Sequence, residues 1–210
     1  MGPKDLFEIV SNPIPCSYMS DYYTHHYQVY HDRTFSVDPS SFLNPLAAHL
    51  NTGSIVVDVG CGSGRDILWL QKRGYHAIGL ERCRGLAGLA RQNTSSRIIE
   101  ADFKTYDFTE LAADALVLIG ALVHLPHAGF PGVLESICGA LNNPGFLVIT
   151  MKQGSGTVTD QDGRQFYLWQ DKDLRNVYQS QKLKVINFFR QPSMINPTDT
   201  WLGYVLKKNG

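Results

Sequence analysis

The stretch of sequence that decides the fold is Ile55-Val56-Val57-Asp58-Val59-Gly60-Cys61-Gly62-Ser63-Gly64-Arg65-Asp66. A short β-branched run closed by glycines is typical of a strand buried on both faces of a sheet. Residues 65–73 have the pattern of a helix, and Gly74 suits its end. Glycines in the turn between strand and helix allow backbone angles closed to other residues and let a ligand approach closely. The stretch therefore predicts a strand, a ligand-binding turn and a helix.

The same alternation continues along the chain. Further strands are predicted at 76–80, 97–100, 115–119 and 146–151, with helices around 86–91 and 130–141. This order implies a parallel sheet with right-handed crossovers. After residue 152 a polar loop (154–164) and a helix (171–181) lead to two late strands, 184–189 and 201–206, which we expect to form an antiparallel pair at one edge. The predicted fold class is α/β: a Rossmann-like, doubly wound, seven-stranded sheet, mostly parallel.

The segment before the first strand is helical in pattern and rich in tyrosine. With 210 residues the chain suits one compact domain. We therefore predict a single domain over 1–210, in which residues 1–50 form a helical cap or lid on a Rossmann-like core at 51–210. The tyrosines at positions 22, 23, 27 and 30 could close over a site, although packing of an amphipathic helix on the sheet explains most of them equally well.

Composition narrows the class of partner. Lys+Arg and Asp+Glu are equal at 19 each, and no basic stripe typical of a nucleic-acid binder is present. The longest apolar run, 115–123, is too short to span a bilayer, and no signal peptide pattern is seen. The four cysteines form no CxxC pair and no metal-ligand spacing. We expect a cytoplasmic protein, a monomer or weak homodimer, with no metal, nucleic-acid or membrane partner.

Two acidic positions follow the glycine turn at informative intervals. Glu81 ends the predicted second strand, about 20 residues beyond the turn, where a carboxylate can accept bonds from the vicinal hydroxyls of a ribose. Asp102 and Phe103 follow the third strand, where an acid can bind an adenine amino group and a ring can cover the base. A solvated acid is the ordinary alternative for Glu81, but the order of the three elements favours a nucleoside site.

The spacing of the glycines disfavours a nicotinamide dinucleotide. That fingerprint needs G-x-G-x-x-G or G-x-G-x-x-A, and Arg65 stands where its third small residue belongs. Here the pattern is G-x-G-x-G, with Asp58 two positions before the first glycine.

On these motifs the sequence resembles the class I S-adenosylmethionine-dependent methyltransferases. Residues 58–64 look like their first motif, Glu81 their second, and 101–103 the adenine-contacting one; the segment after strand four (119–126) and the turn into strand five (143–149) are also similar. More narrowly, the sequence resembles a group of small bacterial tellurite-resistance-like methyltransferases. That likeness rests on the runs at 30–38, 64–66 and 199–202.

The resemblance implies S-adenosylmethionine as cofactor, with S-adenosylhomocysteine as product. Gly60, Gly62 and Gly120 would line its methionine part, and Glu81 would hold the ribose. Arg33 would pair the methionine carboxylate through its planar fork, beneath Tyr23. The implied cofactor-binding residues are Tyr23, Arg33, Asp58, Gly60, Cys61, Gly62, Glu81, Asp102, Phe103 and Gly120. One departure is Glu81-Arg82-Cys83 in place of the family's usual Asp-Gly-Ser.

The predicted reaction is methyl transfer to a small-molecule acceptor by in-line displacement. A sulfonium is already activated, so alignment and exclusion of water suffice. His124 and His127 follow the fourth strand, and His124 is the candidate general base; a loop histidine bonded to backbone is the open alternative. Arg164 and Trp201 are candidates for acceptor binding. A non-catalytic S-adenosylmethionine-binding protein and, less favoured, an NAD-dependent oxidoreductase are the rival functions.

Overall fold

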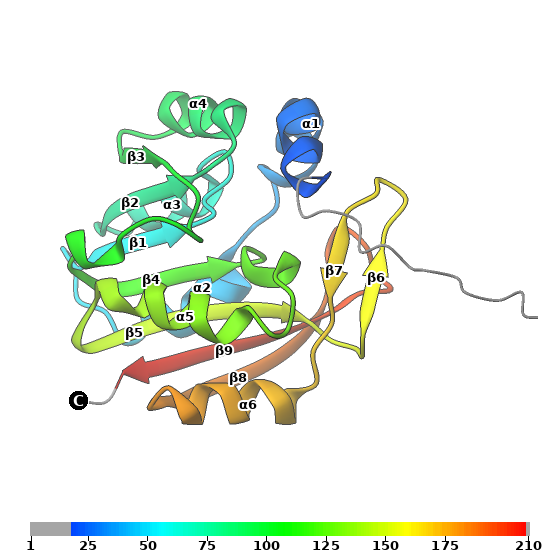
Figure 1. Ribbon diagram of the computed structural model, residues 1–210. Coiled ribbons are helices and arrows are strands. Elements are labelled where there is room, and N and C mark those ends of the chain that lie inside the picture. Colours follow the sequence, from blue (N-terminus) through cyan, green and yellow to red (C-terminus); the bar gives the residue numbers. More distant parts are fainter. Residues whose placement is uncertain (1–17, 209–210) are drawn as a thin grey trace, which may run out of the picture.

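Strands and helices alternate through residues 18–208, the part of the chain that the computed structural model describes (Figure 1). In chain order the elements are α1 (Tyr18–Thr34), α2 (Ser40–Ala47), β1 (Ile55–Val59), α3 (Arg65–Gln71), β2 (His76–Glu81), α4 (Arg84–Asn93), β3 (Arg97–Glu100), η1 (Phe108–Glu110), β4 (Ala113–Ile119), η2 (Leu122–His124), α5 (Phe130–Ile137), η3 (Cys138–Ala140), β5 (Leu141–Lys152), β6 (Thr157–Thr159), β7 (Gln165–Tyr167), α6 (Asp171–Ser180), β8 (Leu183–Pro192) and β9 (Thr200–Lys208). None of these described helices is long and apolar enough to cross a membrane.

The main sheet has seven strands in the order β3-β2-β1-β4-β5-β9-β8. The first five in the chain pair in parallel, whereas β9 is antiparallel to both β5 and β8. The predicted fold class and its antiparallel edge pair are confirmed. The burial of the two late strands agrees with their order in the sheet: residues 202–206 of β9 are all buried, whereas in β8 only Leu183 is buried and the other residues are exposed or partly buried.

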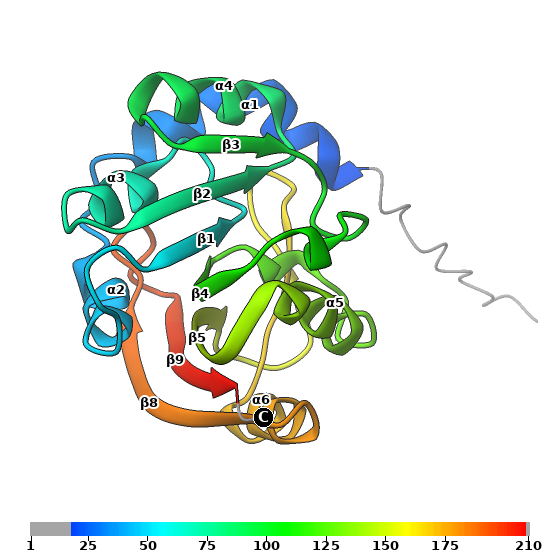
Figure 2. The same cartoon turned by 90° about the vertical axis from the view of Figure 1, so that its left-hand side faces the viewer.

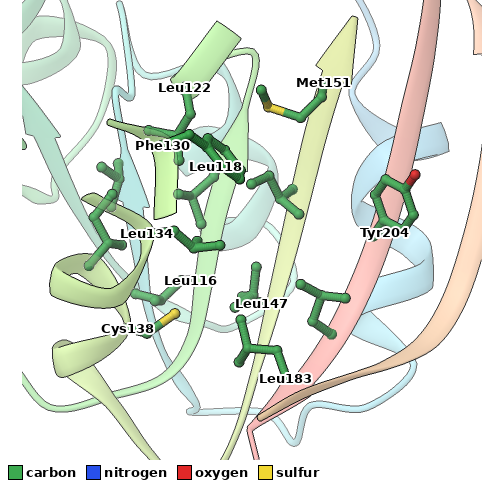
Figure 3. Packing of buried hydrophobic residues seen from close by; sticks show 14 of the residues in the cluster. Leu116, Leu118, Leu122, Phe130, Leu134, Cys138, Leu147, Met151, Leu183 and Tyr204 are labelled. Carbon is green, nitrogen blue, oxygen red and sulfur yellow. The ribbon is translucent and has the colours of Figure 1, made fainter. Parts of the chain in front are cut away.

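Helices cover both faces of the sheet (Figure 2). Alternate residues of β1 point to opposite faces, because side chains along a strand alternate. Val56 packs with the apolar residues of α2, α3 and α4, whereas Val57 and Val59 belong to the cluster on the side of α5 and α6. Figure 3 shows part of that second cluster, in which Leu116 and Leu147 of the sheet lie near α5. The central strands are therefore buried on both sides, as the β-branched run predicts.

Two boundaries differ from the sequence-based expectation. The predicted polar loop at 154–164 instead contains β6 and leads into β7, which pair as a separate two-stranded antiparallel hairpin. All three residues of β6 are exposed, and β7 buries only Phe166, so the hairpin shows too little apolar alternation to be recognised in the sequence. The predicted helix at 130–141 ends at Ile137, followed by a short 3₁₀ turn, and β5 starts already at Leu141 because that residue pairs with Ala113.

The two N-terminal helices have different positions. Helix α1 lies near the end of the sheet toward which the parallel strands point (Figure 1). It is kinked at His26 and packs on α4, where a Cβ on Gly85 would lie 2.5 Å from the ring of Tyr27. Helix α2 instead buries Leu43 and Leu46 in the core beside β5. Of the predicted cap at 1–50, residues 1–17 lie outside the described residues.

Candidate active site

A cavity of about 960 Å³ opens at the carboxyl ends of the parallel strands. Its walls come from the loops after β1, β2, β3 and β4, from α1 and from the β6–β7 hairpin. Figure 1 shows α1 and the hairpin side by side at this end of the molecule. In open α/β sheets ligands bind at this edge, and the volume is that of a site for a cofactor and a small second ligand.

The glycine turn after β1 needs glycine for two reasons: its backbone angles are left-handed, and there is no room for a side chain at two of its positions. Gly60, Gly62 and Gly64 all have positive φ, at 74°, 56° and 89°. A Cβ on Gly60 would lie 2.9 Å from Ala121, and one on Gly64 would lie 2.9 Å from Thr94, so both positions are sterically closed. At Gly62 the nearest atom is a ring carbon of Tyr30 at 3.9 Å. Gly62 therefore leaves open space on the cavity side, where a ligand can approach the backbone.

Glu81 joins the glycine turn to the end of β2. Its carboxylate lines the cavity and accepts the N–H of Gly62 at 3.0 Å on one oxygen and that of Cys83 at 2.8 Å on the other. Burial raises the pKa of Glu81, and the two backbone N–H bonds counter part of that rise. Each oxygen has a second lone pair, so the acid can still accept hydroxyl groups. This geometry fits the ribose role.

After β3, the chain contributes the aromatic ring of Phe103 to the cavity wall. Phe103 lines it together with Lys104 and Arg82. The carboxylate of Asp102 lies beside the lining, accepts the backbone N–H of Lys104 at 2.9 Å and is 3.8 Å from the guanidinium of Arg82. The aromatic wall predicted for a base is thus present, with the acid at its margin.

Three other predicted cofactor residues lie at or beneath the turn. Gly120 lines the cavity with φ at 65°, and its N–H already donates to Thr150 at 2.9 Å, which leaves its carbonyl for a ligand. Asp58 and Cys61 are buried beneath the turn and outside the lining. One oxygen of Asp58 has no hydrogen-bond partner, and burial raises its pKa, with the charge of Asp66 adding to the rise.

Tyr23 and Arg33 on α1 have different surroundings. Tyr23 lines the cavity, and its hydroxyl is 3.0 Å from Nε2 of His124. The side chain of Arg33 is 49% exposed, lies outside the lining and is 3.4 Å from the carboxylate of Asp162 at the hairpin. The structure therefore brings Tyr23, but not Arg33, to the cavity.

His124 lies in the cavity wall, at the end of the 3₁₀ turn that follows β4. Its Nδ1 is 2.6 Å from the backbone carbonyl of Gln165. Burial lowers the pKa of His124 from 6.5 to about 4, with Arg164, Arg82 and Lys152 adding to the fall. His127, by contrast, lies outside the lining and contacts the carbonyl of Leu168 at 2.8 Å through Nε2. Of the two histidines, only His124 faces the cavity.

Neither predicted acceptor-binding residue is part of the lining. Arg164 pairs with Asp160 at 2.7 Å and lies 4.8 Å from the ring of Tyr22, although its neighbours Gly163 and Gln165 do line the cavity. Trp201 lies behind Gly120, where an added Cβ would meet it at 3.6 Å. Arg164 ties the hairpin to α1, and Trp201 supports the loop after β4.

Much of the acceptor-side wall was missed by sequence reasoning. The residues concerned are Leu125, Pro126, Gly129, Val133, Thr159, Gln165 and Tyr167. Tyr30, one of the tyrosines named as a possible cover, does line the cavity, seven residues from Tyr23 along α1. The hairpin gave no signal, since β6 is fully exposed and β7 buries only Phe166. Within residues 18–208 no cluster of three or more His, Cys, Asp and Glu side chains could hold a metal.

The methyltransferase domain family matches residues 23–190, a span that begins within α1 and ends within β8. The chain belongs to the methyltransferase domain family. The class I, S-adenosylmethionine-dependent identity predicted from the motifs is thereby confirmed, and an open Gly62, a buried Glu81 and the ring of Phe103 fit that cofactor. No curated protein sequence matches the chain.

Solved structures of methyltransferases share the fold of the whole chain. The 1,6-didemethyltoxoflavin-N1-methyltransferase of Burkholderia thailandensis, bound to 1,6-didemethyltoxoflavin and S-adenosylhomocysteine, is 18% identical, with 96% of this chain and 94% of that one covered and a TM-score of 0.78. Magnesium protoporphyrin IX methyltransferase of Synechocystis, with bound S-adenosylmethionine, is 14% identical (92% and 96% covered, TM-score 0.73). A TehB-like methyltransferase of Corynebacterium glutamicum is 22% identical (88% and 98% covered, TM-score 0.66). At these identities the likeness is one of fold.

Proposed function

We propose that the protein transfers the methyl group of S-adenosylmethionine to a small-molecule acceptor inside the cavity. The observation that carries this proposal is the division of the cavity into two ends. At one end Gly62 is open and bonded to the buried carboxylate of Glu81; at the other, aromatic and apolar side chains surround His124. Two of the similar structures are enzymes named for small organic acceptors, which supports an acceptor of that size.

The cofactor supplies an activated methyl group, and the protein has to align it and exclude water. Glu81 is suited to the ribose, Gly60, Gly62 and Gly120 to the methionine part, and Phe103 to the adenine. Tyr23 and Tyr30 of α1 line the site together with Thr159 and Tyr167 of the hairpin. Holding the two reactants in line and excluding water between them supplies much of the rate enhancement of a displacement.

Other assignments in this proposal rest on chemistry alone. Asp58 and Cys61 beneath the turn, Asp102 at the adenine, and Arg164 and Trp201 near the acceptor remain predictions. Arg33 as the partner of the methionine carboxylate also remains a sequence-based prediction, and its half-exposed position outside the lining lends it no support. A net charge of zero supports a small ligand over nucleic acid. The described cysteines, Cys61, Cys83 and Cys138, are all unpaired, which suits the cytoplasm; a monomer or weak homodimer is expected.

Calorimetric titration tests the cofactor part of the proposal. S-adenosylhomocysteine and S-adenosylmethionine should bind, and NAD should bind far more weakly, because Arg65 occupies the position of the third dinucleotide glycine. Tighter binding of NAD would contradict the proposal. Acceptor-dependent release of S-adenosylhomocysteine from a panel of small hydroxyl, amine and thiol compounds tests the transfer itself. Binding without any release would favour the non-catalytic alternative.

A further inference from the structure

The hydroxyl of Tyr23 and the imidazole of His124 meet at the acceptor end of the cavity. They come from positions about a hundred residues apart, on α1 and after β4, and the Oη–Nε2 distance is 3.0 Å. Both residues line the cavity, so an acceptor lying there would touch this pair. The contact joins α1 directly to the loop after β4.

The hydrogen-bond partners decide which atom of His124 carries its proton. The carbonyl of Gln165 can only accept, so the Nδ1 that lies 2.6 Å from it must be the protonated nitrogen. Nε2 of the neutral ring is then a free acceptor. Burial raises the pKa of Tyr23, so its hydroxyl keeps its proton and donates it to Nε2. Arg164 is a further hydrogen-bond donor to the phenol oxygen of Tyr23. The remaining lone pair of that oxygen can accept a hydrogen bond from a ligand in the cavity.

Cations and carboxylates both lie near this pair. Arg164, just before the hairpin strand β7, lies near His124 and is also a hydrogen-bond donor to the hydroxyl of Tyr23. Arg82 and Lys152 lie near His124 as well, whereas Glu81 and the hydroxyl of Tyr30 face Tyr23. Lys152 is bonded to Asp199 at 2.6 Å and lies 3.7 Å above the ring of Phe166, which packs against His124. Burial favours the neutral form of the imidazole at rest, and the three cations add to this effect.

We propose that Tyr23 and His124 act as one proton-accepting pair, in which Tyr23 Oη takes the proton of an O–H or weakly basic N–H acceptor while the hydroxyl proton of Tyr23 passes to His124 Nε2. This inference rests on the proposed function. The acceptor atom forms its bond to the methyl carbon as the carbon–sulfur bond breaks, and that electron pair stays on sulfur. The proton ends on Nε2, Nδ1–H remains on the Gln165 carbonyl, and water takes the proton when the site opens.

The same pair selects the class of acceptor. A methylated hydroxyl or aromatic N–H becomes very acidic as the new bond forms, so even a weak base such as His124, with a pKa of about 4, can remove its proton. The ammonium ion that forms when an alkylamine is methylated has a pKa of about 10. A base as weak as His124 does not remove its proton, so the pair would contribute nothing to that reaction. The pair therefore indicates a hydroxyl or a weakly basic N–H acceptor, and not an alkylamine.

Histidine NMR of the protein bound to S-adenosylhomocysteine tests the pair without any acceptor. We expect His124 as the Nδ1–H form, with an unprotonated Nε2 whose resonance moves in Tyr23→Phe and not in the matched variant Tyr27→Phe, which loses a hydroxyl from an exposed position of the same helix. His124 protonated on Nε2, or a resonance indifferent to Tyr23→Phe, would overturn the proposal.

Kinetics with defined probes tests the step. Catechol and 3-hydroxypyridine represent the predicted class, and benzylamine represents the excluded one. Tyr23→Phe and His124→Gln should each lower kcat on a hydroxyl probe by about a hundredfold, the size of a general-base contribution, while KM changes less than threefold. His127→Gln, which alters a histidine outside the lining, should leave kcat unchanged. The kcat of the unaltered protein should stay level from about pH 8 down to about pH 5.

The outcomes separate the two proposals. If S-adenosylhomocysteine does not bind, the proposed function fails. If it binds equally to the unaltered protein and to Tyr23→Phe, but transfer to a hydroxyl probe is unaffected by Tyr23→Phe, only the pair fails. Preferred methylation of benzylamine, or no transfer to either hydroxyl-bearing probe while S-adenosylhomocysteine binds, would overturn the assigned acceptor class.

Discussion

At the cofactor end of the cavity the wall is formed by Gly60, Gly62, Glu81 and Phe103, all within residues 58–103. At the acceptor end the wall is formed by Tyr23, His124, Gln165 and Tyr167, which come from three segments far apart in the chain. The first end is held mainly by backbone groups, such as the N–H donors of Gly62 and Cys83 on Glu81. The second is held by side chains that meet across the cavity.

Because of this difference, the two ends of the cavity should respond differently to substitutions in α1 and the hairpin. Consecutive βα units hold the cofactor end, so its geometry follows from the sheet itself and should withstand changes in α1 or the hairpin. The acceptor end depends on the docking of α1 against the hairpin, for which Tyr22 and Arg33 both contact the carboxylate of Asp162. Four changes, two at each end, test this comparison.

Glu81→Ala should have the largest effect on the cofactor end. It removes a charged acceptor of the ribose and leaves two backbone N–H groups unpaired, so S-adenosylhomocysteine should bind at least tenfold more weakly, in line with about 1.5–3 kcal/mol for a hydrogen bond to a charged group. Calorimetry measures it. Glu100→Ala is the matched control, since Glu100 pairs with Glu81 in the sheet register but lies outside the cavity lining. If Glu81→Ala and Glu100→Ala bind S-adenosylhomocysteine equally well, Glu81 does not bind the ribose and has only a structural role.

Lowering the pH should reduce the free energy of unfolding, because His124 at the acceptor end is buried in its neutral form. Its pKa falls from 6.5 in the unfolded chain to about 4 in the fold, so between these values the unfolded state binds more protons and stability is lost as pH falls. From about pH 7 to about pH 5 the free energy of unfolding should drop by about 2 kcal/mol on account of this residue, at about 1.4 kcal/mol per pKa unit.

Urea denaturation of the unaltered protein and of His124→Gln at both pH values isolates that loss. The comparison with the variant is needed because burial raises the pKa of Glu81 and Asp58. These two groups increase the free energy of unfolding as the pH falls, whereas His124 decreases it. The variant should lack the loss of about 2 kcal/mol. If the free energy of unfolding changes equally with pH in the two proteins, the imidazole of His124 is not held in its neutral form by the fold.

Gly62→Ala separates backbone strain from ligand contact. A residue with a Cβ at this positive φ should cost about 1–2 kcal/mol of unfolding free energy, and the same holds for Gly53→Ala, where φ is 87° and the surroundings are open. Only Gly62→Ala places its methyl group toward the cavity, so only this variant should lose affinity for S-adenosylhomocysteine, by fivefold or more. Loss of affinity in both variants would attribute the effect to strain alone.

Arg33→Ala should have the smallest effect. The guanidinium is half exposed and its ion pair with Asp162 lies outside the lining, so such a pair contributes at most about 1 kcal/mol to stability and the affinity for S-adenosylhomocysteine should change less than threefold. Asp162→Ala breaks the same pair and is the control. A tenfold loss of affinity in Arg33→Ala but not in Asp162→Ala would show that Arg33 binds the methionine carboxylate after all.

The sequence by itself determined the parallel sheet and the cofactor end. The β-branched run of β1, the glycines after it and Glu81 at the end of β2 are local patterns whose meaning does not depend on the rest of the chain, because strand burial, turn angles and the spacing of a βα unit are set within about 30 residues. Their reading as a class I methyltransferase needed only those residues in that order.

Only the tertiary structure decided the acceptor end. No local pattern marks β6 and β7, because β6 is fully exposed and β7 buries a single side chain, while the hairpin is held through Asp162 to α1 and through the carbonyl of Gln165 to the loop after β4. The sequence named Tyr23 and His124 as candidates, but it could not tell that the two side chains meet at 3.0 Å. Those outcomes depend on how α1 and the hairpin dock over the strand ends, and long-range contacts between side chains leave no periodic trace in the chain.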